Sequence, residues 1–246
     1  MGCFLQIAPV DEVVLDWFRT NGRDLPWRRT RDPYAILVSE VMLQQTQVER
    51  VAPRYALWLE RWPSAKALAE APLADVIREW QGLGYNRRAV SLHRAAQHVA
   101  VHGWPDDLTE LPGVGGYTAA AIRNFAFGEP VLPVDTNVRR VQERTGASFR
   151  AECAQALFDL GATVCLARVP RCGVCPLAPH CPSRGRRYEP LRKQSRFEGS
   201  FRQRRAQALR AVADGPRPLV DLDAEAVAAL ERDGLVRLDA AVVALP

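Results

Sequence analysis

Four of the six cysteines fall within one short stretch, and this spacing constrains the fold more than any other feature of the chain. Cys165 is followed by Cys172, Cys175 and Cys181, whereas Cys3 and Cys153 stand apart. Thiols gathered in this way in a cytosolic chain favour metal ligation over disulfide bonds. The stretch is therefore expected to form a compact loop around a bound group.

The spacing of the four cysteines also bears on which group the loop holds. Structural zinc sites usually present two tight pairs of ligands, and residues 165–181 contain only one C-x2-C pair. A [4Fe–4S] cluster accepts four thiolates at uneven spacing, so the pattern favours a cluster. Zinc and unligated thiols are the alternatives that spacing alone leaves open.

Length and charge limit the class of protein. The chain has 246 residues, of which 48% are apolar, enough to fill the core of one large or two modest domains. It has no apolar run long enough to span a membrane and no secretory leader pattern, so we expect a soluble, cytoplasmic protein. The net charge of +5 favours a polyanionic partner but does not establish one.

The hydrophobic pattern predicts a mainly helical body with short connecting loops. Asp11 and Asp32 are each expected to cap a helix, and Pro33 to occupy the first turn of the second. Further helices are predicted over residues 51–61, 65–70, 73–81, 87–102, 117–127 and 151–165. Alternating strand patterns are scarce before residue 215.

A glycine-rich turn, Leu111-Pro-Gly-Val-Gly-Gly-Tyr-Thr118, precedes the helix at 117–127. Gly113 and Gly115 lack a Cβ, so bare backbone N–H groups there can approach an anion. The start of the following helix favours phosphate in the same way. A simple connection between two helices is the alternative interpretation.

Composition changes after the last cysteine of the cluster loop. Nine basic side chains crowd this segment, namely Arg184, Arg186, Arg187, Arg192, Lys193, Arg196, Arg202, Arg204 and Arg205. Residues 184–201 form either a basic linker that follows phosphates or a solvated connector. Helices are expected at 202–213 and 224–233, and a hairpin at 234–245, as in a winged-helix module or another small α+β fold.

Several motifs carry a family resemblance when they are taken together. They are Leu25-Pro-Trp-Arg28, the string from Ser39 to Val48 (SEVMLQQTQV), Gly82-Leu-Gly-Tyr85, Leu111 to Gly115, Val134-Asp-Thr-Asn137 and the cysteine loop. This order resembles the helix-hairpin-helix DNA glycosylases, and the string that begins at Ser39 resembles their adenine-specific branch. The match extends from about residue 10 to residue 185.

The resemblance implies a fold, a cofactor and a partner. The expected fold is a two-lobed helical glycosylase domain over residues 1–183, with a [4Fe–4S] cluster held by Cys165, Cys172, Cys175 and Cys181. The linker at 184–201 and a small module at 202–246 would follow. The implied partner is double-stranded DNA with a mismatched or damaged base, bound by a monomer near the nucleoid rather than at a membrane.

Two carboxylates carry the implied chemistry. Glu40 matches the general acid that protonates the leaving base, and Asp135, with Asn137 beside it, matches the carboxylate that stabilises the cationic sugar. Glu40 shares a helix face with Ile36, where partial desolvation would favour its protonated form. Taken singly, either residue would more often be an ordinary surface acid.

The remaining expected contacts go to DNA. Gly113 and Gly115 would clamp a phosphate, while Leu83 and Tyr85 would enter the base stack as wedges. The residues that match the lining of the pocket for the excised base are Arg23, Trp27 and Arg28. Those that match residues near the opposite base are Gln45 and Thr46. Arg168 and Arg171 would be presented to phosphates by the cysteine loop.

Tyr117 limits the reaction to hydrolysis. In the strand-cleaving branch of the family, this position carries a lysine whose amine attacks the sugar and forms a Schiff base. Tyrosine cannot form that imine, so we expect a monofunctional glycosylase without efficient AP-lyase activity.

The identity of the excised base is less constrained. The pocket residues favour adenine opposite 8-oxoguanine or guanine. The Nudix-like domain that reads 8-oxoguanine in these relatives is expected to be missing, and the segment 138–164 is shorter than theirs. The alternatives are a glycosylase for uracil or thymine opposite guanine, and a non-catalytic protein that binds damaged DNA.

Overall fold

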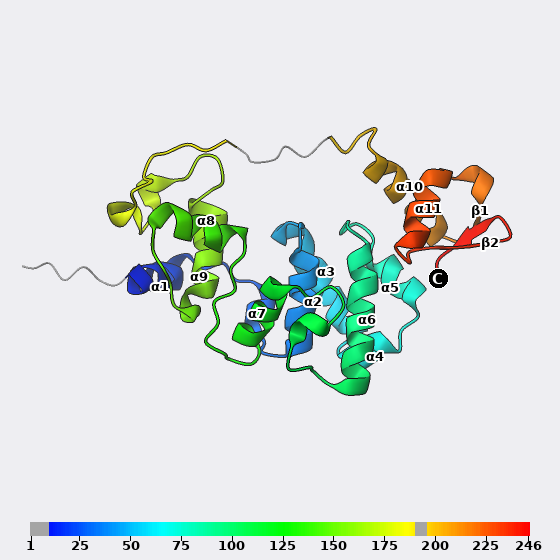
Figure 1. Cartoon of the computed structure of the whole chain (residues 1–246), viewed down its shortest axis with the longest axis horizontal. Helices are drawn as coiled ribbons and strands as arrows, with labels where there is room; N and C mark the ends of the chain where they lie inside the picture. The colour runs from blue at the N-terminus through cyan, green and yellow to red at the C-terminus, as the bar shows by residue number, and fades with distance from the viewer. Residues whose placement is uncertain (1–9, 190–195) are drawn as a thin grey trace, which may run out of the picture. The chain divides into compact units, whose positions relative to one another are not determined.

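The structure, a computed structural model, describes residues 10–189 and 196–246 (Figure 1). Arg192 and Lys193 of the expected basic linker therefore lie outside the described residues. The chain divides into two compact units. Unit 1 comprises Met1–Arg31 and Gly116–Lys193, and unit 2 comprises Asp32–Gly115 and Gln194–Pro246.

Unit 1 is helical throughout its described part. Its α-helices are α1 (Val10–Asn21), α7 (Gly116–Phe125), α8 (Thr136–Thr145) and α9 (Ala154–Asp159). Shorter helical segments are η1 (Pro26–Arg29), η3 (Ala151–Cys153), η4 (Leu160–Val164), η5 (Cys172–Val174) and η6 (Ala178–His180). The core forms where α1, α8 and α9 meet, around Val14, Val138 and Leu157.

Unit 2 contains a larger helical group and the C-terminal module. The helices before the module are α2 (Pro33–Leu43), α3 (Val48–Arg61), α4 (Ala65–Ala69), α5 (Leu73–Trp80), α6 (Arg87–His102) and η2 (Leu108–Glu110). Helix α2 is buried on every side from Tyr34 to Met42. Its N-terminus is capped as expected, since the Asp32 carboxylate accepts hydrogen bonds from the backbone of Tyr34 and Ala35.

The C-terminal module is the α+β element that the sequence predicted. It consists of α10 (Phe201–Ala213), β1 (Arg217–Pro218), η7 (Leu219–Asp221), α11 (Ala224–Arg232), β2 (Arg237–Asp239) and β3 (Val242–Ala244). The strands form an antiparallel sheet in the order β1-β3-β2, which is the strand order of a winged-helix module. Leu209, Val227 and Val243 pack with Ile77 of α5 and Val90 of α6, so the module shares a core with unit 2.

Ion pairs hold the two helices of the module together. Arg204 of α10 pairs with Asp223 at 2.8 Å and with Glu225 at 2.9 Å. Arg205 pairs with Asp233 at the end of α11. Two of the arginines that the sequence assigned to a basic segment are therefore bound to carboxylates within the module.

The structure corrects two details of the predicted helices. Asp11 lies inside α1, and its carboxylate accepts hydrogen bonds from the Arg150 backbone at 3.0 Å and the Arg150 Nε at 3.2 Å, so it does not cap the helix. Residues 151–164 form a 3-10 turn, a short α-helix and a π-helical turn instead of one continuous helix. None of the helices in the described ranges has the length and apolar character needed to cross a membrane.

The fold class was predicted correctly. The structure is mainly helical with one small three-stranded sheet at its C-terminal end. The predicted boundaries at residues 183 and 201 separate the module along the sequence, whereas the compact units group it with residues 32–115.

Candidate active site and cysteine cluster

Asp135 begins helix α8 and is held tightly by it. Its Oδ1 accepts hydrogen bonds from the backbone of Asn137 at 2.8 Å and of Val138 at 2.7 Å. Its Oδ2 accepts a third from Nδ2 of Asn137 at 2.7 Å. These bonds fix the orientation of a partly exposed carboxylate at the N-terminus of α8.

A chain of hydrogen bonds connects Asp135 with the cysteine loop. Nη2 of Arg140 donates to Oδ1 of Asn137 and to the Gly161 carbonyl, both at 2.7 Å, and Nε donates to the Cys165 carbonyl at 2.7 Å. Asn137 in turn donates to Asp135. The backbone carbonyl of Cys165 is thus connected to the Asp135 carboxylate through the side chains of Arg140 and Asn137.

Close packing fixes Asn137 from the opposite direction. A Cβ added at Gly161 would lie 2.6 Å from Cβ of Asn137, so only glycine fits at this crossing of α8 and η4. The sequence analysis did not single out Gly161. Its position in a predicted helix is a signal that was available, because a glycine inside a helix often has a packing reason.

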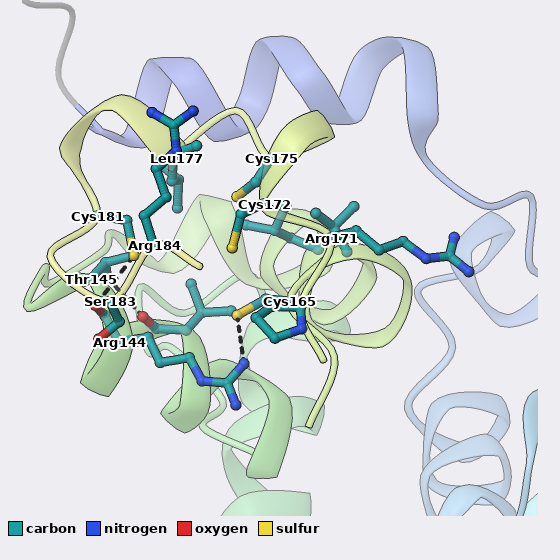
Figure 2. Close-up of a pocket in the computed structure, with 15 residues that line it drawn as sticks. Arg144, Thr145, Cys165, Arg171, Cys172, Cys175, Leu177, Cys181, Ser183 and Arg184 are labelled. Atoms are coloured by element: carbon teal, nitrogen blue, oxygen red, sulfur yellow. Dashed lines mark hydrogen bonds between the residues drawn. The ribbon is translucent and has the colours of Figure 1, made fainter. Parts of the chain in front are cut away.

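The four clustered cysteines surround one cavity (Figure 2). Cys165, Cys172, Cys175 and Cys181 all line it, together with apolar groups such as Leu177. The Gly185 backbone donates a hydrogen bond to Sγ of Cys172 at 3.3 Å. The structure thus brings together the four thiols that the sequence grouped, and Cys153 lies apart from them, buried beside Asp11.

Arg144 supports this loop from helix α8. Its guanidinium donates to the Leu166 and Ala167 carbonyls at 2.7 Å and to Sγ of Cys165 at 3.4 Å. It also stacks on Tyr188, 3.8 Å from the ring centre. Both terminal nitrogens of this 7% exposed arginine thus donate to the loop.

The donor set fits an iron–sulfur cluster in number and type. Within residues 10–189 and 196–246, no group of three or more His, Cys, Asp and Glu side chains is arranged to hold a metal ion. The four thiols nevertheless line a single cavity, which is the donor set that a [4Fe–4S] cluster requires. Arg168 and Arg171 of the loop are exposed, as expected for phosphate contacts.

Arg28, one of the predicted base-pocket residues, is bound to Asp159. Its guanidinium donates to both carboxylate oxygens of Asp159, at 2.8 and 2.9 Å, and to the carbonyls of Arg23 and Gln155. These bonds anchor Arg28 within unit 1, and its place in the base pocket stays a prediction. Trp27 lies beside it, half-buried, in η1.

Asp159 is the residue that sequence reasoning missed. Its side chain is fully buried, and Arg23 also binds it, through its backbone N–H at 2.7 Å and Nε at 2.8 Å. Burial alone would raise the pKa of Asp159, but the hydrogen bonds from Arg28 and Arg23 lower it below its ordinary value. An acid in an otherwise apolar helical stretch was the available signal.

Tyr117 is the second residue of α7 and is partly buried. Its ring lies edge-to-face against Phe158, with 6.3 Å between the ring centres. Unit 1 therefore carries Tyr117, Asp135, Asn137, the base-pocket candidates and the four cysteines.

Glu40 lies in the last turns of α2, in unit 2, and is 6% exposed. Ser39, Val41 and Ile36 of the same helix are also buried. The predicted desolvation of this carboxyl group is confirmed, and an ordinary surface role is excluded.

The glycine-rich turn has the predicted backbone conformation at one position. Gly113 has a φ of +81°, and an added Cβ would lie 2.7 Å from Cβ of Ser91. A Cβ added at Gly115 would have no heavy atom within 4 Å beyond its chain neighbours. The requirement for glycine is therefore steric at Gly113, while Gly115 leaves its backbone accessible.

The two predicted wedge residues differ in exposure, and Leu83 is the buried one. This side chain is 2% exposed and packs in the core of unit 2, so it cannot enter a base stack without leaving that core. Tyr85, by contrast, is 49% exposed and has a φ of +47°. Gln45 is likewise exposed with a φ of +58°, next to the half-buried Thr46.

Comparison with known proteins gives consistent matches. The model of the HhH-GPD superfamily of base excision DNA repair proteins matches residues 38–157. The chain is 41% identical to an adenine DNA glycosylase of Mycolicibacterium smegmatis, over 87% of this chain and 83% of that protein. It is 37% identical to the adenine DNA glycosylase of Homo sapiens, over 70% of this chain and 39% of that protein.

Solved structures agree with the fold. A thermostable thymine-DNA glycosylase superposes with a TM-score of 0.64 at 28% identity, covering 70% of this chain and 94% of that chain. An endonuclease III in a trapped covalent complex with DNA superposes with a TM-score of 0.61 at 23% identity, covering 70% and 92%. With this agreement in sequence and architecture, the chain belongs to the HhH-GPD superfamily of base excision DNA repair proteins.

Proposed function

We propose that this protein is a DNA glycosylase that removes adenine mispaired with 8-oxoguanine or guanine. The observation that carries the proposal is the 41% identity to an adenine DNA glycosylase across 83% of that relative. The buried Glu40 and Asp135, which caps the N-terminus of α8, support it, because purine excision needs an acid and an anion in different environments.

Glu40 serves as the general acid. Loss of an adenine anion from the sugar is unfavourable, so a proton must reach the purine ring as the bond breaks. Glu40 is 6% exposed, and burial in general disfavours the charged form of a carboxyl group. After the bond has broken, the resulting carboxylate can accept a proton from the attacking water.

Asp135 stabilises the positive charge that develops on the sugar. Three hydrogen bonds hold its two oxygens, so it need not reorganise as charge appears. Asn137 positions Oδ2 and is itself fixed by Arg140, which makes Asn137 and Arg140 positioning residues.

The DNA contacts would offset the cost of flipping the base. Extraction of a nucleotide from the duplex costs a few kcal/mol of lost stacking and pairing. Tyr85, exposed on its loop, would fill the vacated stack, and the backbone near Gly115 would bind a phosphate. Gln45 and Thr46 would contact the opposite base.

The substrate assignment is tested with a panel of duplexes under single-turnover conditions. Each contains one A:8-oxoG, A:G, U:G or T:G pair, and abasic product is measured after alkaline cleavage. We expect excision of adenine from the first two duplexes only. Excision confined to U:G or T:G would replace the assignment, and tight binding without product would indicate a non-catalytic binder.

Excision of uracil or thymine opposite guanine is the second candidate. The structural likeness to a thymine-DNA glycosylase, with a TM-score of 0.64, favours it specifically. Its lower identity of 28%, against 41% for an adenine DNA glycosylase, places it second.

The excision is expected to leave an intact abasic strand. Tyr117 offers a phenol where strand cleavage requires an amine, so no Schiff base can form there. Borohydride treatment during turnover should trap almost no covalent protein–DNA complex. A Tyr117→Lys variant is the positive control, and efficient trapping by the unaltered protein would refute the prediction.

We further propose that the four cysteines of the loop hold a [4Fe–4S] cluster. When bound, the cluster would brace the loop that presents Arg168 and Arg171, and we assign it no redox step. Purified protein should contain about four iron and four sulfide per chain, and Cys172→Ser should lower both, whereas Cys153→Ser should not. Stoichiometric zinc without iron would contradict this proposal.

A further inference from the structure

Arg88 is the second residue of α6, and its guanidinium closes the C-terminal end of α2. Nη1 donates to the carbonyl of Val41 at 2.6 Å, of Met42 at 2.9 Å and of Gln44 at 2.6 Å. The last carbonyls of a helix have no partner within it, and the helix dipole favours a cation there. Arg88 therefore acts as the C-terminal cap of the helix that carries Glu40.

The same guanidinium also fixes the loop that carries Tyr85. Nη2 donates to the Gly84 carbonyl at 2.9 Å and the Leu83 carbonyl at 3.3 Å, and Nε donates to the Tyr85 carbonyl at 3.3 Å. The guanidinium carbon lies 5.2 Å from the Trp80 ring centre and 5.6 Å from that of Tyr85. A positive φ is disfavoured for tyrosine, and these bonds hold Tyr85 in that conformation.

Two more contacts join the loops to each other. Nη2 of Arg88 donates to Oγ1 of Thr46 at 2.9 Å, and that hydroxyl donates to the Leu83 carbonyl at 3.1 Å. One turn further along α6, Ser91 packs against Gly113, whose carbonyl accepts a hydrogen bond from Gln44 at 3.4 Å. The first turns of α6 thus hold the loops at residues 44–46, 82–85 and 112–115 in one arrangement.

We propose that Arg88 is a positioning residue that sets the arrangement of Tyr85, Gln45 and Glu40 for base flipping and excision. The inference rests on the proposed function, since it assumes that these residues act on a flipped nucleotide. Burial lowers the pKa of Arg88 to about 10, so the guanidinium remains charged at neutral pH. Its fork binds at least six acceptors, which the single ammonium group of a lysine cannot match.

The test compares Arg88→Lys and Arg88→Gln with Arg87→Gln. Arg87 is the adjacent residue of α6, and its side chain is 77% exposed. Its substitution removes the same charge without removing the contacts that Arg88 makes. Single-turnover excision is measured with saturating enzyme, and DNA affinity separately. We expect the rate constant to fall about 100-fold in both Arg88 variants, as for a small misplacement of reacting groups, with affinity within about threefold.

The shape of the progress curve separates positioning from loss of folding. A variant that is partly unfolded gives a lower amplitude with an unchanged rate constant, whereas a mispositioned site gives a lower rate constant at full amplitude. An unchanged rate constant in Arg88→Lys, or an equal loss in Arg87→Gln, would overturn the proposal.

A second readout keeps the inference separate from the substrate assignment. Duplexes with 2-aminopurine beside the target base become more fluorescent when that base leaves the stack. The unaltered chain should raise the fluorescence, and Arg88→Lys should bind equally well with a smaller rise. The rate comparison uses whichever duplex the unaltered chain cleaves. If it cleaves none, the fluorescence comparison alone decides. A rise in fluorescence with Arg88→Lys equal to that with the unaltered chain would overturn the proposal.

Discussion

Replacement of Asp135 by asparagine should abolish base excision while leaving the fold intact. The change removes the negative charge beside the sugar, and loss of one preorganised electrostatic group typically costs about 10²- to 10³-fold in rate. Asparagine caps helices as well as aspartate does, so α8 should still be capped through its side-chain oxygen. The melting temperature and DNA affinity should therefore change little.

The measurement for Asp135 is single-turnover excision, with thermal unfolding in parallel. Asp223→Asn is a matched control, because Asp223 is also an N-cap, at the start of α11 in the C-terminal module, where its side chain accepts a hydrogen bond from the Ala226 backbone. The control should retain normal excision. If Asp135→Asn kept more than about a tenth of the wild-type rate, its proposed electrostatic role would be excluded.

Replacement of Glu40 by glutamine should cause the second large loss, about 10²- to 10⁴-fold for adenine, because a glutamine amide cannot protonate the leaving base. The two side chains have nearly the same shape, so α2 should pack as before around this buried position. The expected defect is confined to the excision rate. DNA affinity, measured by titration with uncleaved duplex, should stay near that of the unaltered chain.

Glu60→Gln is the matched control for Glu40. Glu60 lies exposed in α3 of the same unit, so its substitution removes one negative charge from the surface only. Excision by this variant should be normal. Substantial activity of Glu40→Gln on uracil or thymine, without activity on adenine, would indicate a leaving group that does not need this proton.

Sequence patterns predicted the regular helices well where local signals were strong. Helix α6 runs from Arg87 to His102 as expected, because its apolar periodicity is clear and Gly103 ends it with a φ of +76°. The segment 151–165 was predicted as a single helix and is not one. Within it, Gly161 packs against Asn137, a contact between separate helical segments that local sequence patterns do not encode.

The sequence identified candidate site residues, but it did not predict which side chains they contact. The position of Asp135 at a helix start follows from local sequence, and the structure confirms it. Arg28 was assigned to the base pocket from the family resemblance, and its partner Asp159, 131 residues away, could not be predicted from local sequence. The burial of Leu83 was not predicted either, since it arises from tertiary packing.

The ion pairs of the C-terminal module alter what the positive net charge means for DNA binding. Cations that bind phosphates displace condensed counterions, and each such contact steepens the dependence of affinity on salt. Arg204 and Arg205 are already paired with Asp223, Glu225 and Asp233. Their charges are therefore neutralised within the module and are not available for phosphates. The salt dependence of binding should therefore reflect fewer phosphate contacts than the arginine content of residues 184–205 suggests.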